Sequence, residues 1–234
     1  MQHADLREQV VAANLALVRA GLVILTFGNA SAVDRDAGVA AIKPSGVSYD
    51  RLAAADVAVV DLATGAVVEG ETRPSSDTPT HLALYGAWQN VGGIVHTHSP
   101  FATAWAQARL EIPCYGTTHA DHFDGAVPVT RALTPGEIEG EYERATGDVI
   151  VETFAALELD PLARPAVLVA SHGPFVWSVS VEEAVENAIA LEAVAASAYH
   201  SATLARALEP IPTALLEKHF SRKHGAAAYY GQPV

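Results

Sequence analysis

Helical patterns and short apolar runs alternate along the whole chain, and this alternation limits the fold more than any other feature of the sequence. Apolar residues recur at helical spacing in residues 6–17 and 181–207, and apolar runs at residues 23–27 and 94–98 predict buried strands. Several strands are joined by short hairpin connections, whereas parallel neighbours need long crossovers. With no repeat or linker-like stretch, the sequence predicts an α/β fold, a single domain spanning residues 1–234 with a central mixed, largely antiparallel β-sheet covered by helices on its faces.

The charge balance and the cysteine content exclude several classes of protein. The 234 residues carry a formal net charge of −13, so no general attraction to nucleic acid or anionic membranes is expected. The single cysteine, Cys114, excludes an intramolecular disulfide framework and a cysteine-rich zinc module. The first residues lack the apolar stretch of a signal peptide, and no run approaches the roughly 18 apolar residues of a transmembrane helix. We therefore expect a cytoplasmic protein with no nucleic-acid or membrane partner.

A His-x-His pattern at the end of an apolar run is the clearest chemical signal in the chain. Side chains at i and i+2 of a strand share a face, about 6.6–6.8 Å apart along the chain, so His96 and His98 can converge on one ion. His172 follows another apolar run, and Asp77 stands at a predicted helix entrance. Three imidazoles and one carboxylate suit zinc or another first-row divalent ion. The alternatives are solvent-facing or hydrogen-bonded core histidines and, for Asp77, a plain helix N-cap.

Further histidines and possible proton-transfer groups lie elsewhere in the chain. Spacing alone does not exclude His119 and His122 as metal ligands. Asp121 could transfer a proton or could be a surface turn residue. The aromatic pair Tyr229-Tyr230 could supply a second proton-transfer group, could cover an apolar surface, or could dock on a neighbouring subunit.

Three short segments have the composition of anion-binding turns. They are Gly28-Asn29, Lys43-Pro44-Ser45-Gly46 and Ser75-Ser76. Each combines small residues that expose backbone N–H groups with a hydroxyl, amide or ammonium donor. Taken singly, each segment is an ordinary turn, and none is a nucleotide-binding fingerprint. Their occurrence together with the metal-ligand candidates favours a phosphorylated ligand.

Seven segments match one family of enzymes, and they extend over essentially the whole chain. The chain resembles the bacterial L-ribulose-5-phosphate 4-epimerases of the class II aldolase/epimerase superfamily. The matching segments are LTFGNAS (25–31), IKPSG (42–46), PSSDTPTH (74–81), GGIVHTH (92–98), GTTHAD (116–121), SHGP (171–174) and RKHG through YG (222–231). Together they form a highly specific pattern.

The resemblance implies a role for each group of residues. The metal, zinc or another divalent ion such as Mn2+ or Co2+, would be held by Asp77, His96, His98 and His172. The substrate phosphate would lie among Gly28, Asn29, Lys43, Ser45, Gly46, Ser75 and Ser76. Asp121 and Tyr230 would transfer protons, and His219 and Thr117 lie in segments that approach the site. The resemblance also implies a homotetramer with active sites at subunit interfaces.

The activity implied by the resemblance is an isomerase reaction of carbohydrate metabolism, with arabinose catabolism as its pathway. It interconverts L-ribulose 5-phosphate and D-xylulose 5-phosphate by zinc-dependent retro-aldol cleavage and re-addition at C3–C4. Carbon 4 of a 2-ketose phosphate is not next to the carbonyl, so simple deprotonation there is difficult. Breaking and remaking the C3–C4 bond avoids that difficulty, and two proton-transfer groups then serve the two epimers.

Some residues depart from the family pattern, and other activities stay open. Phe27 stands where family members commonly carry Trp, and His122 and Asp124 stand where aromatic residues are expected, which affects the pocket shape. The alternatives are an L-xylulose-5-phosphate 4-epimerase and a class II sugar-phosphate aldolase of the L-fuculose-phosphate type. A third alternative is a non-catalytic scaffold on the same fold, as in adducin heads.

Overall fold

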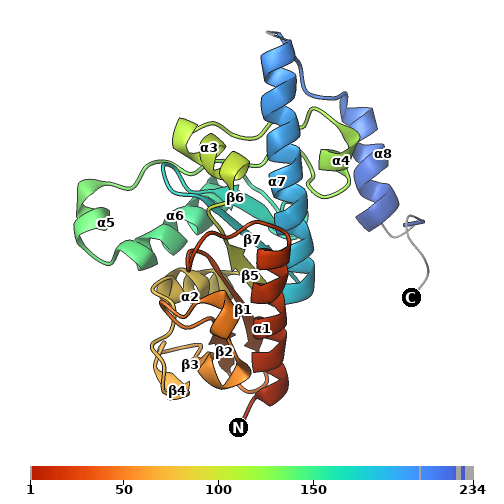
Figure 1. The fold of residues 1–234 in the computed structure, drawn as a ribbon. Helices are drawn as coiled ribbons and strands as arrows, with labels where there is room; N and C mark the ends of the chain where they lie inside the picture. The colour runs from red at the N-terminus through yellow and green to blue at the C-terminus, as the bar shows by residue number, and fades with distance from the viewer. Residues whose placement is uncertain (1, 206, 225–227, 230–234) are drawn as a thin grey trace.

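The centre of the structure, a computed structural model that describes residues 2–205, 207–224 and 228–229, is a seven-stranded β-sheet (Figure 1). The strand order is β4-β3-β2-β1-β5-β7-β6, and each neighbouring pair is antiparallel. The largely antiparallel sheet predicted from the sequence is thus confirmed, and a parallel contact occurs as an isolated bridge between Val129 and Leu168. The strands are β1 Asn29–Asp34, β2 Val39–Ile42, β3 Ala58–Asp61, β4 Val67–Glu69, β5 Gly93–His96, β6 Ala166–Leu168 and β7 Pro174–Ser178.

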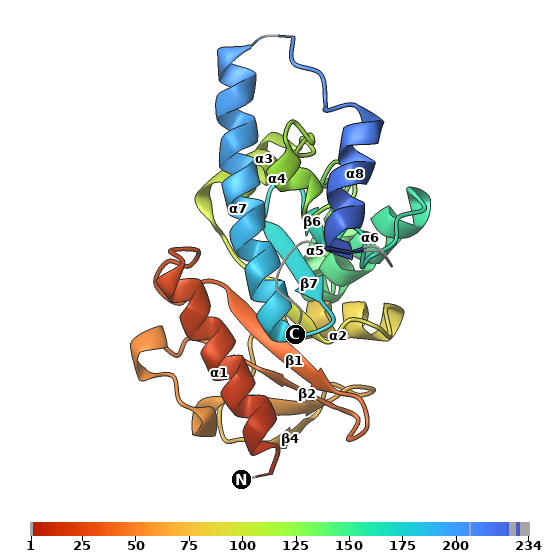
Figure 2. The same ribbon diagram turned by 90° about the vertical axis from the view of Figure 1, so that its right-hand side faces the viewer.

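Helices cover both faces of the sheet, as predicted. The long helices α1 and α7 contact each other on one face, with α7 extending well beyond α1 in Figures 1 and 2, while α2 and α6 pack together on the other. The helices are α1 Ala4–Arg19, α2 Thr78–Ala87, α3 Pro100–Ala108, α4 Thr117–Ala120, α5 Pro135–Glu139, α6 Tyr142–Ala156, α7 Val181–Leu204 and α8 Thr213–His224, with 3-10 turns at Tyr49–Arg51 and Ala54–Asp56. None of the helices in the described residues has the length and apolar character needed to cross a membrane.

Alternation along the central strands divides the core into two layers. In β5, Val95 faces the layer under α1 and α7, whereas Ile94 faces the layer under α2 and α6. His96 follows the same alternation as Ile94 and pairs in register with Phe175 of β7. The first histidine of the His-x-His pattern therefore projects from the end of a central strand that is buried on both faces.

Two features of the local structure differ from the strand predictions. Residues 23–27 form a turn instead of a strand, and Leu25 there has φ +56° and is 77% exposed. An apolar run shows that a segment could be a strand, but not that a neighbouring strand is free to pair with it. The next strand in the chain, β1, begins at Asn29 and already pairs with β2 on one side and β5 on the other. Strand β5 also ends at His96, so His98 lies beyond the strand in the segment that leads to α3.

The C-terminal end of α2 is closed by a side chain from the β1–β2 connection. The Arg35 guanidinium donates to the backbone carbonyl oxygens of Tyr85, Trp88 and Val91 at 3.2, 3.0 and 2.9 Å. The last carbonyl groups of a helix have no partner within the helix, so such a donor satisfies them. The Arg35 side chain thereby fixes the end of α2, the helix that Asp77 precedes.

Candidate active site

Three imidazoles converge where the C-terminal end of β5 meets the turn between β6 and β7. The nitrogen atoms of His96, His98 and His172 that could bind a metal all lie within 4.8 Å of one another. The Nε2 atoms of His96 and His98 are 3.1 Å apart. Two nitrogens bound at 2.0–2.1 Å to a tetrahedral zinc ion would be separated by about 3.3 Å. The three histidines predicted as ligands are therefore brought together at a spacing that fits one ion.

Neighbouring groups orient the first of these rings. The Nδ1 atom of His96 lies 2.9 Å from the Pro174 carbonyl oxygen, so Nδ1–H donates there and Nε2 keeps its lone pair for a ligand. The His96 ring stacks on Phe175 with ring centres 4.2 Å apart. Metal-binding histidines are commonly held by such a second hydrogen bond. The tautomer that His96 adopts is thus the one required for coordination through Nε2.

The environment keeps two of the imidazoles neutral. Burial lowers the pKa of His172 to about 4, with further lowering by His96 and His98. Burial and His96 also lower the pKa of His98. A neutral imidazole has a free lone pair, whereas a protonated one does not. Both side chains are therefore able to bind a cation at neutral pH.

Asp77 stands at the N-cap position of α2, but its side chain makes no capping hydrogen bond. The Asn29 amide instead donates to Asp77 Oδ2 at 2.6 Å. Burial raises the pKa of the carboxyl, but the electrostatic interactions with the His96 and His81 rings and the Asn29 hydrogen bond outweigh burial, so the pKa of Asp77 lies below its ordinary value. The carboxylate is ionised and partly buried, which suits a fourth ligand of a divalent cation and argues against a plain cap.

The anion-binding candidates line the same cavity as these four residues. The cavity has a volume of about 400 Å3. Its walls include all seven predicted phosphate contacts, Gly28, Asn29, Lys43, Ser45, Gly46, Ser75 and Ser76, and all four predicted metal ligands, Asp77, His96, His98 and His172. Segments separated by more than one hundred residues therefore form one polar cavity.

Lys43 is the cation of this cavity, and its side chain is almost completely buried. The residue is 2% exposed, and burial lowers the pKa of its ammonium. Its nitrogen lies 3.4 Å from the Pro44 carbonyl oxygen and 4.6 Å from the centre of the Tyr49 ring. No carboxylate in the described residues lies within 4 Å of the Lys43 nitrogen. A buried ammonium without a carboxylate partner favours binding of an anionic ligand.

Other candidates from the sequence lie away from this cavity. His119 Nε2 is 2.8 Å from the Gly125 carbonyl oxygen, and His122 lies between Asn187 and Lys223, so neither joins the three-histidine cluster. Thr117 begins α4 and does not line the cavity. Nothing in the sequence around these three residues indicates whether each lies in the core, on the surface or in the cavity.

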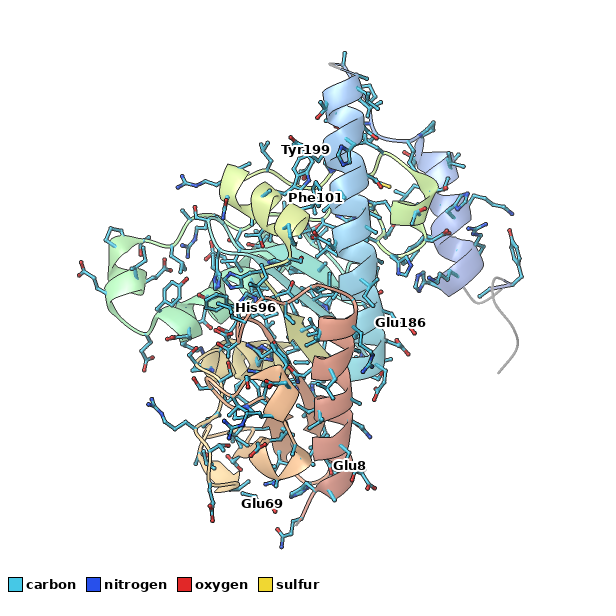
Figure 3. The ribbon with its side chains drawn as sticks, viewed as in Figure 1. Glu8, Glu69, His96, Phe101, Glu186 and Tyr199 are labelled. Carbon is cyan, nitrogen blue, oxygen red and sulfur yellow. The ribbon has the colours of Figure 1, made fainter. Side chains whose placement is uncertain are left out.

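Asp121 belongs to a separate polar cluster between α4 and α8. Its carboxylate accepts hydrogen bonds from Arg222 at 2.9 and 2.7 Å and from His219 at 3.0 Å. Burial opposes ionisation, but these hydrogen bonds prevail and lower the pKa of Asp121. In the views of Figures 1 and 3, α4 and α8 lie on one side of α7, and His96 lies on the other. Tyr230, the second predicted proton-transfer residue, lies outside the described residues.

The sequence reasoning did not single out two further residues that line the cavity. Tyr142 and Glu143 begin α6, and the Tyr142 hydroxyl is 3.4 Å from His172 Nδ1. Burial and the negative charges of Asp77 and Glu143 raise the pKa of Tyr142. No motif marks the start of α6. Only the packing of α6 against α2 brings these side chains to the cavity.

Comparisons with known proteins agree on one family. The family described as "Class II Aldolase and Adducin N-terminal domain" matches residues 8–199. Curated relatives include L-ribulose-5-phosphate 4-epimerase UlaF of Salmonella paratyphi B and the protein of the same name of Salmonella typhi. Each is 53% identical over 227 residues, which are 97% of this chain and 98% of the relative.

Solved structures give the same result at lower identity. An L-fuculose 1-phosphate aldolase superposes with a TM-score of 0.79 at 26% identity, over 95% of this chain and 97% of that one. YgbL of Klebsiella pneumoniae, described as a putative aldolase/epimerase/decarboxylase, superposes with a TM-score of 0.74 at 26% identity, over 93% and 99% of the two chains.

Proposed function

Because the chain belongs to the class II aldolase and adducin N-terminal domain family, we propose that it is an L-ribulose-5-phosphate 4-epimerase, which interconverts L-ribulose 5-phosphate and D-xylulose 5-phosphate. One observation carries the proposal. Eleven residues predicted from the sequence as metal or phosphate contacts line a single cavity. A phosphorylated sugar of five carbons that is held at its phosphate would present its carbonyl end to the three histidines of the same cavity.

In this proposal, His96, His98, His172 and Asp77 hold a divalent cation, with Zn2+ as the first choice and Mn2+ or Co2+ as alternatives. The donor set supports this choice, since imidazole nitrogens with one carboxylate are typical ligands of zinc and related ions. When bound, the ion supplies Lewis-acid stabilisation of the negative charge that develops on the C2 and C3 oxygens of the substrate.

The phosphate contacts hold one end of the substrate throughout the reaction. Lys43 supplies a positive charge, Ser45, Ser75 and Ser76 supply hydroxyl groups, and the segment at Gly46, with φ +69°, supplies backbone N–H groups. After the C3–C4 bond opens, this anchorage keeps the phosphorylated fragment in place. This fragment is glycolaldehyde phosphate, which contains C4 and C5. Its aldehyde group rotates before the enediolate of the three-carbon fragment attacks its opposite face, and the opposite configuration at C4 results.

Two proton-transfer groups complete the proposal. The hydroxyl proton at C4 must leave when the C3–C4 bond breaks, and a proton must return to that oxygen when the bond re-forms. Arg222 and His219 keep Asp121 as a carboxylate, which is the state of a general base. Tyr230 is the proposed partner for the other epimer. Since Asp121 does not line the cavity and is bound by side chains of α8, we propose that it serves the cavity of a neighbouring subunit in a homotetramer.

The test is an assay of the purified protein with L-ribulose 5-phosphate, with detection of D-xylulose 5-phosphate and analysis of bound metal. We expect His98→Asn to lose metal and activity together. Asp121→Asn and Tyr230→Phe should keep the metal and turn over slowly. Full activity in metal-free protein, or unchanged turnover in both proton-transfer variants, would contradict the proposal.

A class II aldolase is the second candidate, because an L-fuculose 1-phosphate aldolase superposes over 95% of this chain. An aldolase would release free aldehyde from a ketose 1-phosphate, whereas an epimerase retains both fragments until they recombine. Detection of released dihydroxyacetone and glycolaldehyde phosphate during turnover of L-ribulose 5-phosphate would favour the aldolase. A non-catalytic scaffold would contain no bound metal.

A further inference from the structure

His81 is a buried histidine that the proposed reaction does not use. It lies one helical turn after Asp77 in α2, where its backbone N–H donates to the Asp77 carbonyl oxygen at 3.1 Å. The residue is 1% exposed. Its Nδ1 lies 2.7 Å from Ser31 Oγ, while its buried Nε2 has no hydrogen-bond partner in the part of the chain that the structure describes. A buried polar atom without a partner is costly and rare in folded proteins, so this one requires an explanation.

A chain of buried hydroxyl groups determines which nitrogen of His81 carries the proton. Ser31 Oγ lies 2.8 Å from the Tyr85 hydroxyl, and the Ile94 backbone hydrogen-bonds the same tyrosine oxygen. Tyr85 therefore donates its one proton to Ser31, and Ser31 donates its own to Nδ1 of His81. The reverse direction would leave the buried Tyr85 proton without an acceptor in the described residues. His81 is then the tautomer that carries hydrogen on Nε2.

The Nε2–H group of His81 requires a hydrogen-bond acceptor. The two groups that interact electrostatically with the His81 ring are Asp77 and His96, and of these only Asp77 offers an anionic acceptor. One carboxylate oxygen of Asp77 is already hydrogen-bonded by Asn29. Phe175 fixes the position of His81, since its ring meets His81 edge-on with centres 6.0 Å apart and stacks on His96.

We infer that His81 is a positioning residue, which donates Nε2–H to the Asp77 carboxylate when that carboxylate is a metal ligand. Together with the Asn29 amide it then holds the carboxylate in one orientation, as second hydrogen bonds commonly do for ligands of metal sites. This inference rests on the proposed metal site. Burial also lowers the pKa of His81 to about 3, so the ring stays neutral and keeps the tautomer at neutral pH.

The first test measures the affinity of purified protein for Zn2+ in competition with a chromophoric chelator, without substrate. His81→Phe keeps an aromatic ring but removes both nitrogens, and we expect it to weaken zinc binding about 10- to 100-fold. His81→Gln can accept from Ser31 and donate to Asp77, so it should restore most of the affinity. Thr80→Val is the matched control, because it removes a buried hydroxyl group from the same helix, one that donates to the Glu143 carbonyl oxygen, and leaves His81, Ser31 and Tyr85 unchanged. It should lower stability and leave zinc affinity unchanged.

The second test reads the tautomer directly in the wild-type protein. Nitrogen chemical shifts of 15N-labelled histidine should show His81 with hydrogen on Nε2, and addition of Zn2+ should shift this signal. Hydrogen on Nδ1, or equal zinc affinity of folded His81→Phe and wild type, would overturn the inference and leave the proposed function standing. Wild-type protein that binds no divalent ion would overturn the metal site itself, and this inference with it.

Discussion

Substitution of Gly173 by alanine tests how tightly the three-histidine site is assembled without changing any ligand. A Cβ at residue 173 would lie 2.8 Å from the Thr97 carbonyl oxygen, 3.6 Å from Thr103 Oγ1 and 3.7 Å from His96 Cε1. Ordinary contacts begin at 3.4 Å, so the turn that carries His172 and the segment after β5 must separate by about 3.4 − 2.8 = 0.6 Å. Metal-to-ligand distances tolerate deviations of about 0.2 Å.

The displacement required is thus several times what a metal site accepts. We expect Gly173→Ala to weaken zinc binding about 10-fold or more, the size of effect seen when groups that orient ligands are disturbed. Overpacking should also lower the free energy of unfolding by about 1–3 kcal/mol. Chelator competition and urea denaturation measure the two effects separately.

A matched control is Gly136→Ala in α5, where a Cβ would meet nothing within 4 Å. It should leave zinc affinity unchanged and stability equal or slightly higher. Folded Gly173→Ala protein with wild-type zinc affinity would refute the reasoning, because it would mean that the turn at His172 is free to move relative to β5.

The remaining predictions concern stability and substrate binding. Burial lowers the pKa of His119 to about 4. Between pH 6.5 and 4 the unfolded chain therefore binds a proton at this residue that the folded chain excludes. The free energy of unfolding should fall over this range as the pH decreases, by up to about 1.4 kcal/mol per pH unit. Urea denaturation of metal-free protein at several pH values measures this loss, and His119→Phe should reduce its slope. Lys43→Met should raise KM for the sugar phosphate far more than it lowers kcat, and it should weaken inhibition by inorganic phosphate; steady-state kinetics with unchanged KM would remove Lys43 from phosphate binding. Arg35→Ala removes the guanidinium that donates to the carbonyl groups of Tyr85, Trp88 and Val91 at the end of α2 and in the segment after it. We therefore expect a loss of about 1–3 kcal/mol in urea denaturation with unchanged bound metal.

Sequence reasoning was most successful where one short segment carries its own signal. Residues 94–96 combine an apolar run with a histidine, and the strand and the projecting side chain follow from that pattern alone. The strand predicted for residues 23–27 was wrong, because an apolar run forms a strand only where a neighbouring strand is free to pair with it. For Asp77, the sequence left a plain helix cap open as an alternative, and only the hydrogen bond from the Asn29 amide on a distant strand, in place of a capping bond, argues against it.

The assembly of the cavity depends on contacts between residues far apart in the chain. His172 reaches His96 only because β7 pairs with β5, and Tyr142 reaches His172 only because α6 packs on α2. The sequence by itself determined the residue types, the elements that carry them and the family pattern, since these depend on local spacing. The tertiary structure alone decided which histidines share a centre, that His119 serves the core and that Asp121 does not line the cavity. The physical reason is that strand pairing and helix packing join residues that lie tens of positions apart along the chain, and no local pattern encodes such contacts.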